Sequence, residues 1–298
     1  MKQLNKNLFD IHADDYALSE SSDNDIITLC KNGKLNSISI IPNLDIFDKS
    51  VKKFLDSKTV FEQDIKISIH LNVMEGKSIS PIEDLPNLVN KEGYFTVSWG
   101  KLFLWNYLPF IRSKIIKQLT KEITAQINAC IDAKIVTPQA IRIDSHQHPH
   151  MIPLFFKALT DSIKENNYKI EYIRNTCDPI RFYLSKQNGL KSISISNVIK
   201  CLILNFYSHK VSRYIKRNKL KNSYLFGVFF SGKMDDRIIP FIPVFEKKSE
   251  NTNHICELLF HPGHMLEAEL TQEFTKTGFI EFHLSSNRKI EYSTCNSL

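Results

Sequence analysis

The sequence predicts an α/β protein in which parallel strands form a closed or nearly closed barrel with helices on the outside. First, short apolar runs alternate with helical stretches along the 298 residues, an order typical of parallel sheets. Second, about seven such strands can be recognised, which suits a barrel. Third, several strands end in Asp, His or Arg, and α/β barrels carry their active sites at the carboxyl ends of strands.

The first half of the chain supplies three of these strands. Residues 8–15 read as a buried strand with a polar end, Asp14-Asp15. A helix follows, with Ser19 or Ser22 as its N-cap and Gly33 at its C-terminal end. Two further strands are predicted at 36–42 and 66–72.

The second half continues the alternation. A long helical pattern covers 115–133, a strand covers 140–146, and Pro149 begins a helix that continues to about residue 166. Three more strands are predicted at 169–175, 227–232 and 255–261. Because no internal repeat or linker interrupts this order, we expect residues 1–298 to form a single domain.

Composition restricts the class of protein. Hydrophobic residues make up 42% and charged residues 24%, which indicates a globular chain rather than a disordered one. No apolar run approaches the roughly 18 residues of a membrane span, and residues 1–10 lack the apolar core of a signal peptide. The six cysteines are scattered without a C-x-x-C pair, which favours reduced thiols. We therefore expect a cytoplasmic protein.

A cluster of histidines gives the clearest functional signal. His146, His148 and His150 lie within five residues, directly after Asp144. In an extended chain all three would point the same way, whereas in a helix His146 and His150 would share a face. Either arrangement can present imidazoles to one ion, and the sequence does not choose between them. The other strand ends carry Asp14, Asp15, His70, Arg174 and His261.

These residue types suit metal-dependent hydrolysis. One carboxylate with two neutral imidazoles is a sound ligand set for a divalent ion that keeps open positions. A second carboxylate can act as general base, and a further histidine can protonate a leaving amine. Each feature also has an ordinary structural interpretation, since Asp14-Asp15 could cap a helix and His70 could be a core histidine. Because all of these features occur together in one chain, we favour a metal-dependent active site.

Four segments, in this order, resemble the YdjC-like carbohydrate deacetylases, the family that includes ChbG and HpnK. They are Ala13-Asp14-Asp15-Tyr16, Ser68-Ile69-His70-Leu71-Asn72, Asp144-Ser145-His146-Gln147-His148-Pro149-His150 and His261-Pro262-Gly263. The resemblance implies a distorted (β/α) barrel, similar to a TIM barrel. It also implies one divalent ion, Mg²⁺ or Zn²⁺, bound by Asp15, His70 and His146.

The same resemblance assigns further roles. Asp14 would be the general base, His261 the proton donor or oxyanion partner, and Arg174 a substrate contact. His148, His150 and Asp144 are alternative ligands or partners of the ligands. The chain departs from the family pattern at Tyr16-Ala17, where Phe-Gly is usual, and at Ser68, where Gly is frequent. If position 17 needs a positive φ, alanine is strained there.

Two basic, apolar segments stand out as insertions, at 101–121 and 198–222. Both combine aromatic and aliphatic residues with Lys and Arg and contain no acidic residue, within a chain of formal net charge +7. One interpretation is a solvated basic face over an ordinary core-facing stripe. The other is an interfacial helix that binds an anionic membrane surface. No recognised nucleic-acid motif accompanies them, so nucleic acid is not an expected partner.

The sequence thus predicts a metal-dependent hydrolase that removes the acetyl group from an N-acetylhexosamine. The two segments favour a sugar carried on a lipid such as undecaprenyl phosphate, at the cytoplasmic face of the membrane. Such a product would feed surface polysaccharide or lipid A modification of lipopolysaccharide. The alternatives are a deacetylase of soluble chitooligosaccharides, a hydrolase of another ester or phosphate, and a sugar- or lipid-binding protein with a vestigial site. The sequence does not give the oligomeric state.

Overall fold

The computed structural model describes residue 5 and residues 7–183 and 194–298. Seven parallel strands form one sheet in the order β5-β4-β3-β2-β1-β7-β6. The strands are β1 (Phe9–Tyr16), β2 (Ser37–Ile40), β3 (Lys66–Leu71), β4 (Ile141–Ser145), β5 (Ile170–Ile173), β6 (Ser223–Phe226) and β7 (Ile255–Phe260). The α/β class and the parallel sheet are therefore confirmed.

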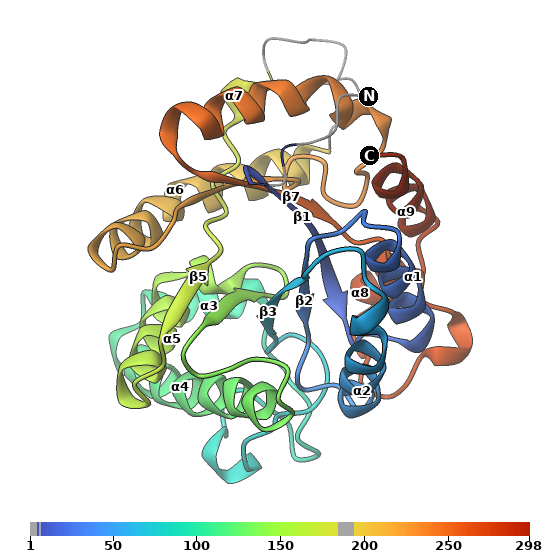
Figure 1. The fold of residues 1–298 in the computed structure, drawn as a ribbon. Coiled ribbons are helices and arrows are strands. Elements are labelled where there is room, and N and C mark those ends of the chain that lie inside the picture. The colour runs from blue at the N-terminus through green and yellow to red at the C-terminus, as the bar shows by residue number, and fades with distance from the viewer. Residues whose placement is uncertain (1–4, 6, 184–193) are drawn as a thin grey trace.

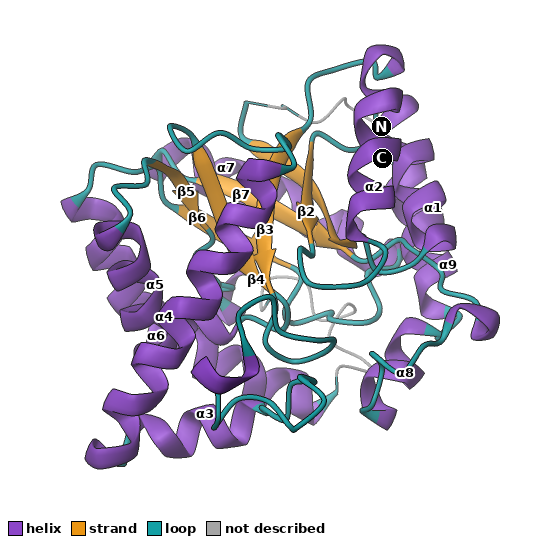
Figure 2. Ribbon diagram, turned by 90° about the horizontal axis from the view of Figure 1, so that it is seen from below, coloured by secondary structure: helices purple, strands orange, loops and turns teal. Residues whose placement is uncertain are grey.

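Helices surround the sheet (Figures 1 and 2). They are α1 (Glu20–Lys31), α2 (Phe47–Ser57), α3 (Trp99–Asn106), α4 (Pro109–Asp132), α5 (Pro153–Glu165), α6 (Ile195–Arg217), α7 (Ile242–Thr252), α8 (Thr277–His283) and α9 (Asn287–Ser297). In both views α3, α4, α5 and α6 gather on one side of the sheet, and α1, α2 and α9 on the other. The predicted insertions coincide with α3 and the start of α4, and with most of α6.

The sheet is a curled half-barrel, which agrees with the expected distorted barrel but not with a closed TIM barrel. No strand ladder joins β5 to β6 in the described part of the chain. These two strands therefore remain the edges of the sheet. The gap is bridged instead by the segment after β5, where the carbonyl of Cys177 accepts a hydrogen bond from the Leu225 amide at 2.9 Å.

Local sequence explains most element boundaries. Ser19 caps α1 and accepts a hydrogen bond from the amide of Ser22 at 3.2 Å, as expected for one of the two predicted caps. Gly33 has a φ of +65° two residues beyond the helix, which is the conformation that ends many helices. All eight residues of β1 are buried, because β2 and β7 pair with its two edges and other parts of the protein cover both of its faces.

The prediction of a strand at 227–232 is wrong. The strand lies immediately before it, as β6, and pairs with β7 from Ser223↔Ile255 to Phe226↔Leu258. Gly227 has a φ of +156° and Gly232 a φ of +81°, and the residues between them form turns. Apolar residues Val228, Phe229 and Phe230 resemble a strand in sequence but pack as a buried turn.

None of the helices within the described ranges has the length and apolar character needed to cross a membrane. The six cysteines are free thiols, five of them buried, so the absence of disulfides expected from their spacing is confirmed.

Candidate active site

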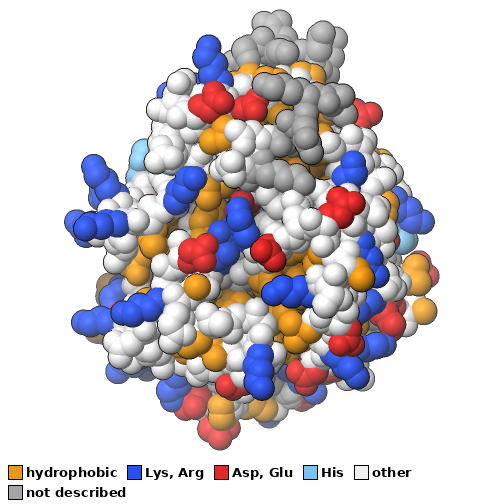
Figure 3. Space-filling view, viewed as in Figure 1, with side chains coloured by type: hydrophobic (Ala, Val, Ile, Leu, Met, Phe, Trp, Pro, Cys, Tyr) orange, Lys and Arg blue, Asp and Glu red, His pale blue; other side chains and the backbone are white. Residues whose placement is uncertain are grey.

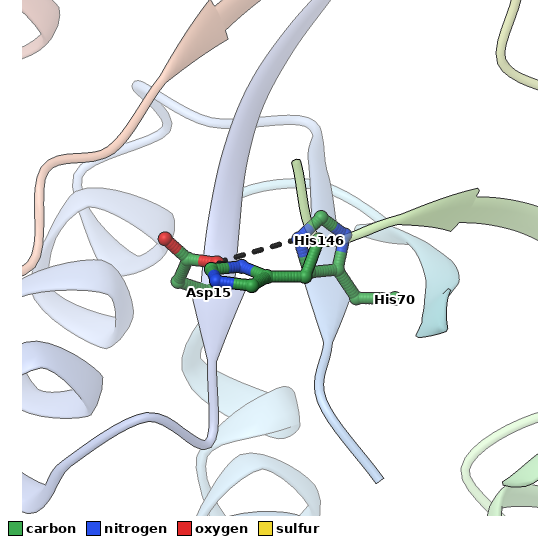
Figure 4. A group of neighbouring side chains, drawn as sticks. All are labelled: Asp15, His70 and His146. Carbon is green, nitrogen blue, oxygen red and sulfur yellow. Dashed lines mark hydrogen bonds and ion pairs between the residues drawn. The ribbon is translucent and has the colours of Figure 1, made fainter. Parts of the chain in front are cut away.

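Three side chains from separate strands meet at the carboxyl edge of the sheet (Figure 4). Asp15 comes from the end of β1, His70 from β3, and His146 from the residue after β4. Each offers one ligand atom, and these atoms lie within 4.8 Å of one another. Asp15 Oδ1 is 3.3 Å from His70 Nε2 and 2.9 Å from His146 Nδ1. The structure thus brings together the three residues that the resemblance implied as metal ligands.

An irregular end of β1 presents both adjacent aspartates to the site. The β1–β2 register shifts between Ala13 and Tyr16, and Asp15 has a φ of +66°. Successive residues of a regular strand point to opposite faces, so this bulge is what lets Asp14 and Asp15 line the same cavity. Ala17, at φ +69°, follows, and its amide donates to the buried carboxylate of Asp23 at 2.8 Å.

His70 and His146 are each held by a carboxylate. His70 Nδ1 lies 2.6 Å from Asp144 Oδ1, which turns Nε2 of the same ring toward Asp15. His146 Nε2 lies 3.1 Å from Glu75 Oε2, and His283 Nε2 lies 3.1 Å from the same oxygen. Metal-binding imidazoles are commonly oriented by such carboxylates.

The electrostatics of the cluster favour a cation. Burial lowers the pKa of His70, but the carboxylates of Asp14 and Asp144 outweigh it and raise the pKa to about 10. Burial also lowers the pKa of His146, but the Asp15 carboxylate outweighs this effect and raises the pKa to about 9. The carboxylates that stabilise these protonated rings would also attract a divalent ion, whose binding displaces the protons. His146 Nε2 is also buried without an aligned hydrogen bond. The donor set of one carboxylate and two imidazoles fits Zn²⁺ better than Mg²⁺, which prefers oxygen ligands.

Asp14 is fixed as a carboxylate beside this cluster. Arg174 donates through both terminal nitrogens, at 2.9 and 2.7 Å, and His12 Nε2 lies 3.1 Å from Asp14 Oδ1. Burial raises the pKa of Asp14, but the charges of Arg174 and His70 lower it well below its usual value. Asp14 is therefore ionised at neutral pH and can accept a proton.

Arg174, expected to contact substrate, lies behind the cavity wall instead. It is fully buried and absent from the cavity lining. Its guanidinium contacts Asp14, Asp144 at 3.0 Å, and Glu257. Those contacts make it a positioning residue for Asp14.

The three clustered histidines separate in the structure. Neither an extended nor a helical segment forms, because Gln147 and His148 have φ values of +64° and +62°. His148 lines the cavity with an unpartnered Nδ1, and burial lowers its pKa well below the usual value. His150 points away, between Ser145 Oγ and the carbonyl of Arg174. Burial and Arg174 lower its pKa to about 4.

His261 follows β7 and lies across the cavity from the histidine cluster. Its Nε2 is 4.0 Å from Asp14 Oδ2, and its side chain is 16% exposed. Its amide donates to Glu291 Oε2 at 2.6 Å, and Nδ1 of its ring lies 3.6 Å from the same oxygen. The exposed edge of the ring thus faces the cavity, whereas His264 lies outside the residues that line it.

Sequence reasoning missed Glu75, His283 and Glu291. Glu75 lies five residues after His70 and just beyond the end of β3, where a search of strand ends could have found it. His283 ends α8 and Glu291 lies in α9, and neither position carries a local pattern. All three are buried: Glu75 contacts His146, Glu291 accepts a hydrogen bond from the His261 amide, and His283 contacts Glu75.

The cavity above these residues has a volume of about 310 Å³. Its lining combines the site residues with Asn197, Lys200, Ser231 and aromatic residues of the α8 region. Phe279 and Phe282 contribute rings, with Phe282 packed edge-on against His261 at a centroid distance of 5.3 Å. A polar floor with aromatic walls of this size suits one sugar ring.

The fold and site define the class of protein: an α/β protein with a buried Asp-His-His cluster and a second ionised aspartate at the carboxyl ends of its strands. The chain belongs to the YdjC-like protein family, whose model matches residues 10–297. Over 164 residues it is 25% identical to a carbohydrate deacetylase of Clostridium beijerinckii, a match that covers 55% of this chain and 59% of that protein.

A solved structure shares the fold. It is a protein of Enterococcus faecalis V583, provisionally named a cellobiose-phosphate cleavage protein, with a TM-score of 0.59 and 18% sequence identity. The superposition covers 97% of this chain and 94% of that one. At this identity the likeness establishes the architecture alone.

Proposed function

We propose that this protein is a metal-dependent carbohydrate N-deacetylase that hydrolyses the acetamido group of an N-acetylhexosamine. The observation that carries the proposal is the position of ionised Asp14 beside the Asp15-His70-His146 cluster, with His261 Nε2 4.0 Å from Asp14 Oδ2 in the same cavity. The family membership and the carbohydrate deacetylase of C. beijerinckii support the same reaction class.

Asp15, His70 and His146 would hold the ion, Mg²⁺ or Zn²⁺ as the resemblance implies, and the two imidazoles favour Zn²⁺. When bound there, such an ion polarises a carbonyl and makes water more acidic. Asp14 accepts the proton of the attacking water, and Arg174 with His12 keeps its carboxylate ionised and aligned. His261 Nε2 donates a proton to the departing amine, so acetate and a free amino sugar are released. Glu291 holds the His261 backbone in place.

The finer part of the proposal is a lipid-linked substrate at the cytoplasmic face of a membrane. Large hydrophobic side chains are exposed along α3, the start of α4, and α6: Phe103, Leu104, Tyr107, Leu108, Phe110, Ile111, Ile195, Ile199, Leu202 and Phe206. The two regions adjoin, since the hydroxyls of Tyr107 and Tyr207 lie 3.0 Å apart. We call these ten residues the apolar face.

Basic side chains accompany the apolar face. Lys and Arg project along the edge of the molecule that carries α6 (Figure 3). The exposed cations of the two regions include Lys101, Lys114, Lys117, Lys210, Arg213, Lys216 and Arg217. Apolar side chains entering a headgroup boundary beside cations suit an anionic membrane. An N-acetylhexosamine on undecaprenyl phosphate, used for surface polysaccharide or lipid A, would be presented there.

Acetate release tests the reaction. Purified protein is incubated with free N-acetylhexosamines, chitooligosaccharides and undecaprenyl-phosphate N-acetylhexosamine, with Mg²⁺ or Zn²⁺ added. We expect release from at least one substrate and a fall of roughly 10²- to 10⁴-fold in Asp14→Asn, because the general base is lost while the shape is kept. Release from chitooligosaccharides alone would favour the soluble-substrate alternative. Metal-loaded, folded protein that releases acetate from none would favour another hydrolase chemistry or a binding role.

A further inference from the structure

A second cavity of about 480 Å³ adjoins the active-site cavity and has a different character. Its walls are the ring of Trp99 and the side chains of Ile199 and Ile203, with Ser196 at one side. The remaining two lining residues, Gln147 and Lys200, also line the active-site cavity. We call this second cavity the apolar groove. The two spaces therefore meet at Gln147 and Lys200.

The junction is built from three separate segments of the chain. Trp99 begins α3, and its Nε1 donates to the carbonyl of Gln147 at 3.1 Å. Gln147 directly follows the proposed ligand His146, and its φ of +64° turns it toward the groove side. Lys200 comes from the first turns of α6. The contact between Trp99 and Gln147 fixes the groove at a set position relative to the metal ligands.

Lys200 is the cation at this junction. No carboxylate of the described residues lies within ion-pair distance of its ammonium group. It is partly buried, and burial lowers its pKa while the charge of Asp14 raises it. A half-buried ammonium group without a counter-ion, open to two cavities, is suited to bind an anionic ligand group.

The groove leads to the apolar face. Ile195, Ile199, Leu202 and Phe206 follow a helical spacing of three to four residues on α6, and they are 78%, 52%, 55% and 72% exposed. Ile199 belongs to both the groove and this stripe. A chain lying in the groove can therefore continue over an apolar surface toward a membrane.

We propose that Lys200 binds the phosphate of an amphiphilic substrate whose sugar occupies the active-site cavity and whose apolar chain lies in the groove. This inference rests on the proposed deacetylase function and names the linkage that its substrate would carry. The polar cavity, the Lys200 ammonium group and the apolar groove follow one another in the same order as the sugar, the phosphate and the apolar chain of such a substrate. Lysine binds phosphate as a point charge, so Lys200 would set specificity without taking part in the hydrolysis.

The catalytic test compares three acetylated substrates: a free N-acetylhexosamine, its 1-phosphate, and its farnesyl-phosphate conjugate. In Lys200→Met we expect kcat/KM to fall roughly 10- to 100-fold for both phosphorylated substrates, through KM, and to change little for the free sugar. Ile199→Asn, which adds polarity to the groove without a charge beside Lys200, should impair only the farnesyl conjugate. Lys52→Met, an exposed cation on α2 outside the cavities and the apolar face, is the control and should leave all three unchanged. Equal losses on all substrates, or no loss on the phosphorylated ones, would overturn the inference.

A binding test separates this inference from the proposed reaction. Trp99 lines the groove, so its fluorescence in a Trp105→Phe background reports occupancy without turnover. We expect farnesyl phosphate to bind more tightly than farnesol, with the difference abolished by Lys200→Met and retained in Lys52→Met. Inorganic phosphate, tested in the same assay, shows whether the anion binds without an apolar chain. If farnesyl phosphate and farnesol bind equally in the unmodified protein, the phosphate assignment is wrong even if deacetylation is observed. If they differ as expected but no acetate is released, the deacetylase proposal fails and the phosphate assignment stands.

Discussion

At the scale of single residues, the backbone around the adjacent aspartates is the feature that most affects function. Ala17 is an alanine with φ +69°, at the position where the resembled family usually has glycine. A left-handed conformation costs a non-glycine residue about 1–2 kcal/mol. The Asp23 carboxylate, hydrogen-bonded to the Ala17 amide, helps to hold this conformation.

This strain predicts an unusual response to glycine. Ala17→Gly relieves the left-handed strain, and that gain offsets the loss of a buried methyl group, about 0.8 kcal/mol, and the added freedom of the unfolded chain. We expect the free energy of unfolding to stay within about 1 kcal/mol of the unmodified protein. Ala13→Gly, also fully buried but in regular β1 backbone, should lose about 1–2 kcal/mol. Urea unfolding measures both, and equal losses would show that position 17 is unstrained.

Sequence predicts some residues of the site and misses others for a physical reason. Asp14, Asp15, His70 and His146 stand at strand ends, where an apolar run followed by a reactive residue is visible. The different fates of His148 and His150 depend on two positive φ values, which no hydrophobic pattern encodes. His283 and Glu291 reach the site through tertiary packing alone, whereas Glu75 lies close to the end of β3.

At the scale of elements, hydrophobic periodicity predicts six of the seven strands at close to their observed places, and it misplaces the last but one. The error arises because Val228, Phe229 and Phe230 are buried in a turn rather than a strand. The pattern also locates the two basic segments, yet it does not show that their helices would adjoin. The Tyr107–Tyr207 contact joins residues whose proximity depends on the whole fold.

The apolar face predicts reversible membrane binding. We expect cosedimentation with vesicles containing anionic lipid, weaker at high salt because the cationic contribution is screened. Phe110 and Phe206 are 90% and 72% exposed, so changing both to Glu should reduce vesicle affinity at least tenfold without loss of thermal stability. Val60→Glu, 58% exposed and outside the apolar face, is the control. Vesicle binding that survives the double change, or is absent at low salt, contradicts the membrane proposal.

At the scale of the whole molecule, the α/β class and the parallel sheet follow from the strand and helix order, but the closure of the sheet does not. Strand number alone suggests a barrel, whereas closure also needs strand tilt and register that bring the two edge strands together. In the described chain β5 and β6 stay unpaired with each other, yet the carboxyl edge of the half-barrel still gathers every proposed ligand.

A bound ion should stabilise this whole assembly. A divalent ion that binds only the folded state should raise its stability by about 2.7 kcal/mol at 100 times its Kd. We expect chelator-treated protein to gain about 5 °C in Tm on adding Zn²⁺ or Mg²⁺. His70→Ala should abolish this gain in Tm. His254→Ala should keep it, because His254 directly precedes β7, at the opposite end of the strand from the site. An unchanged Tm with either ion would contradict a metal site here.

The pairing of β1 with β7 has a consequence for how the protein matures. The first and the last strands of the chain are neighbours in the sheet, with Phe9 opposite Cys256 and Ala13 opposite Phe260. Contacts so distant in sequence are slow to form, because a long loop must close first. A chain that ends before β7 already contains Asp15, His70 and His146, but it lacks the strand that pairs with β1 and the residues His261 and Glu291. We therefore expect the complete site to form only late in folding, after the C-terminal part of the chain has been synthesised.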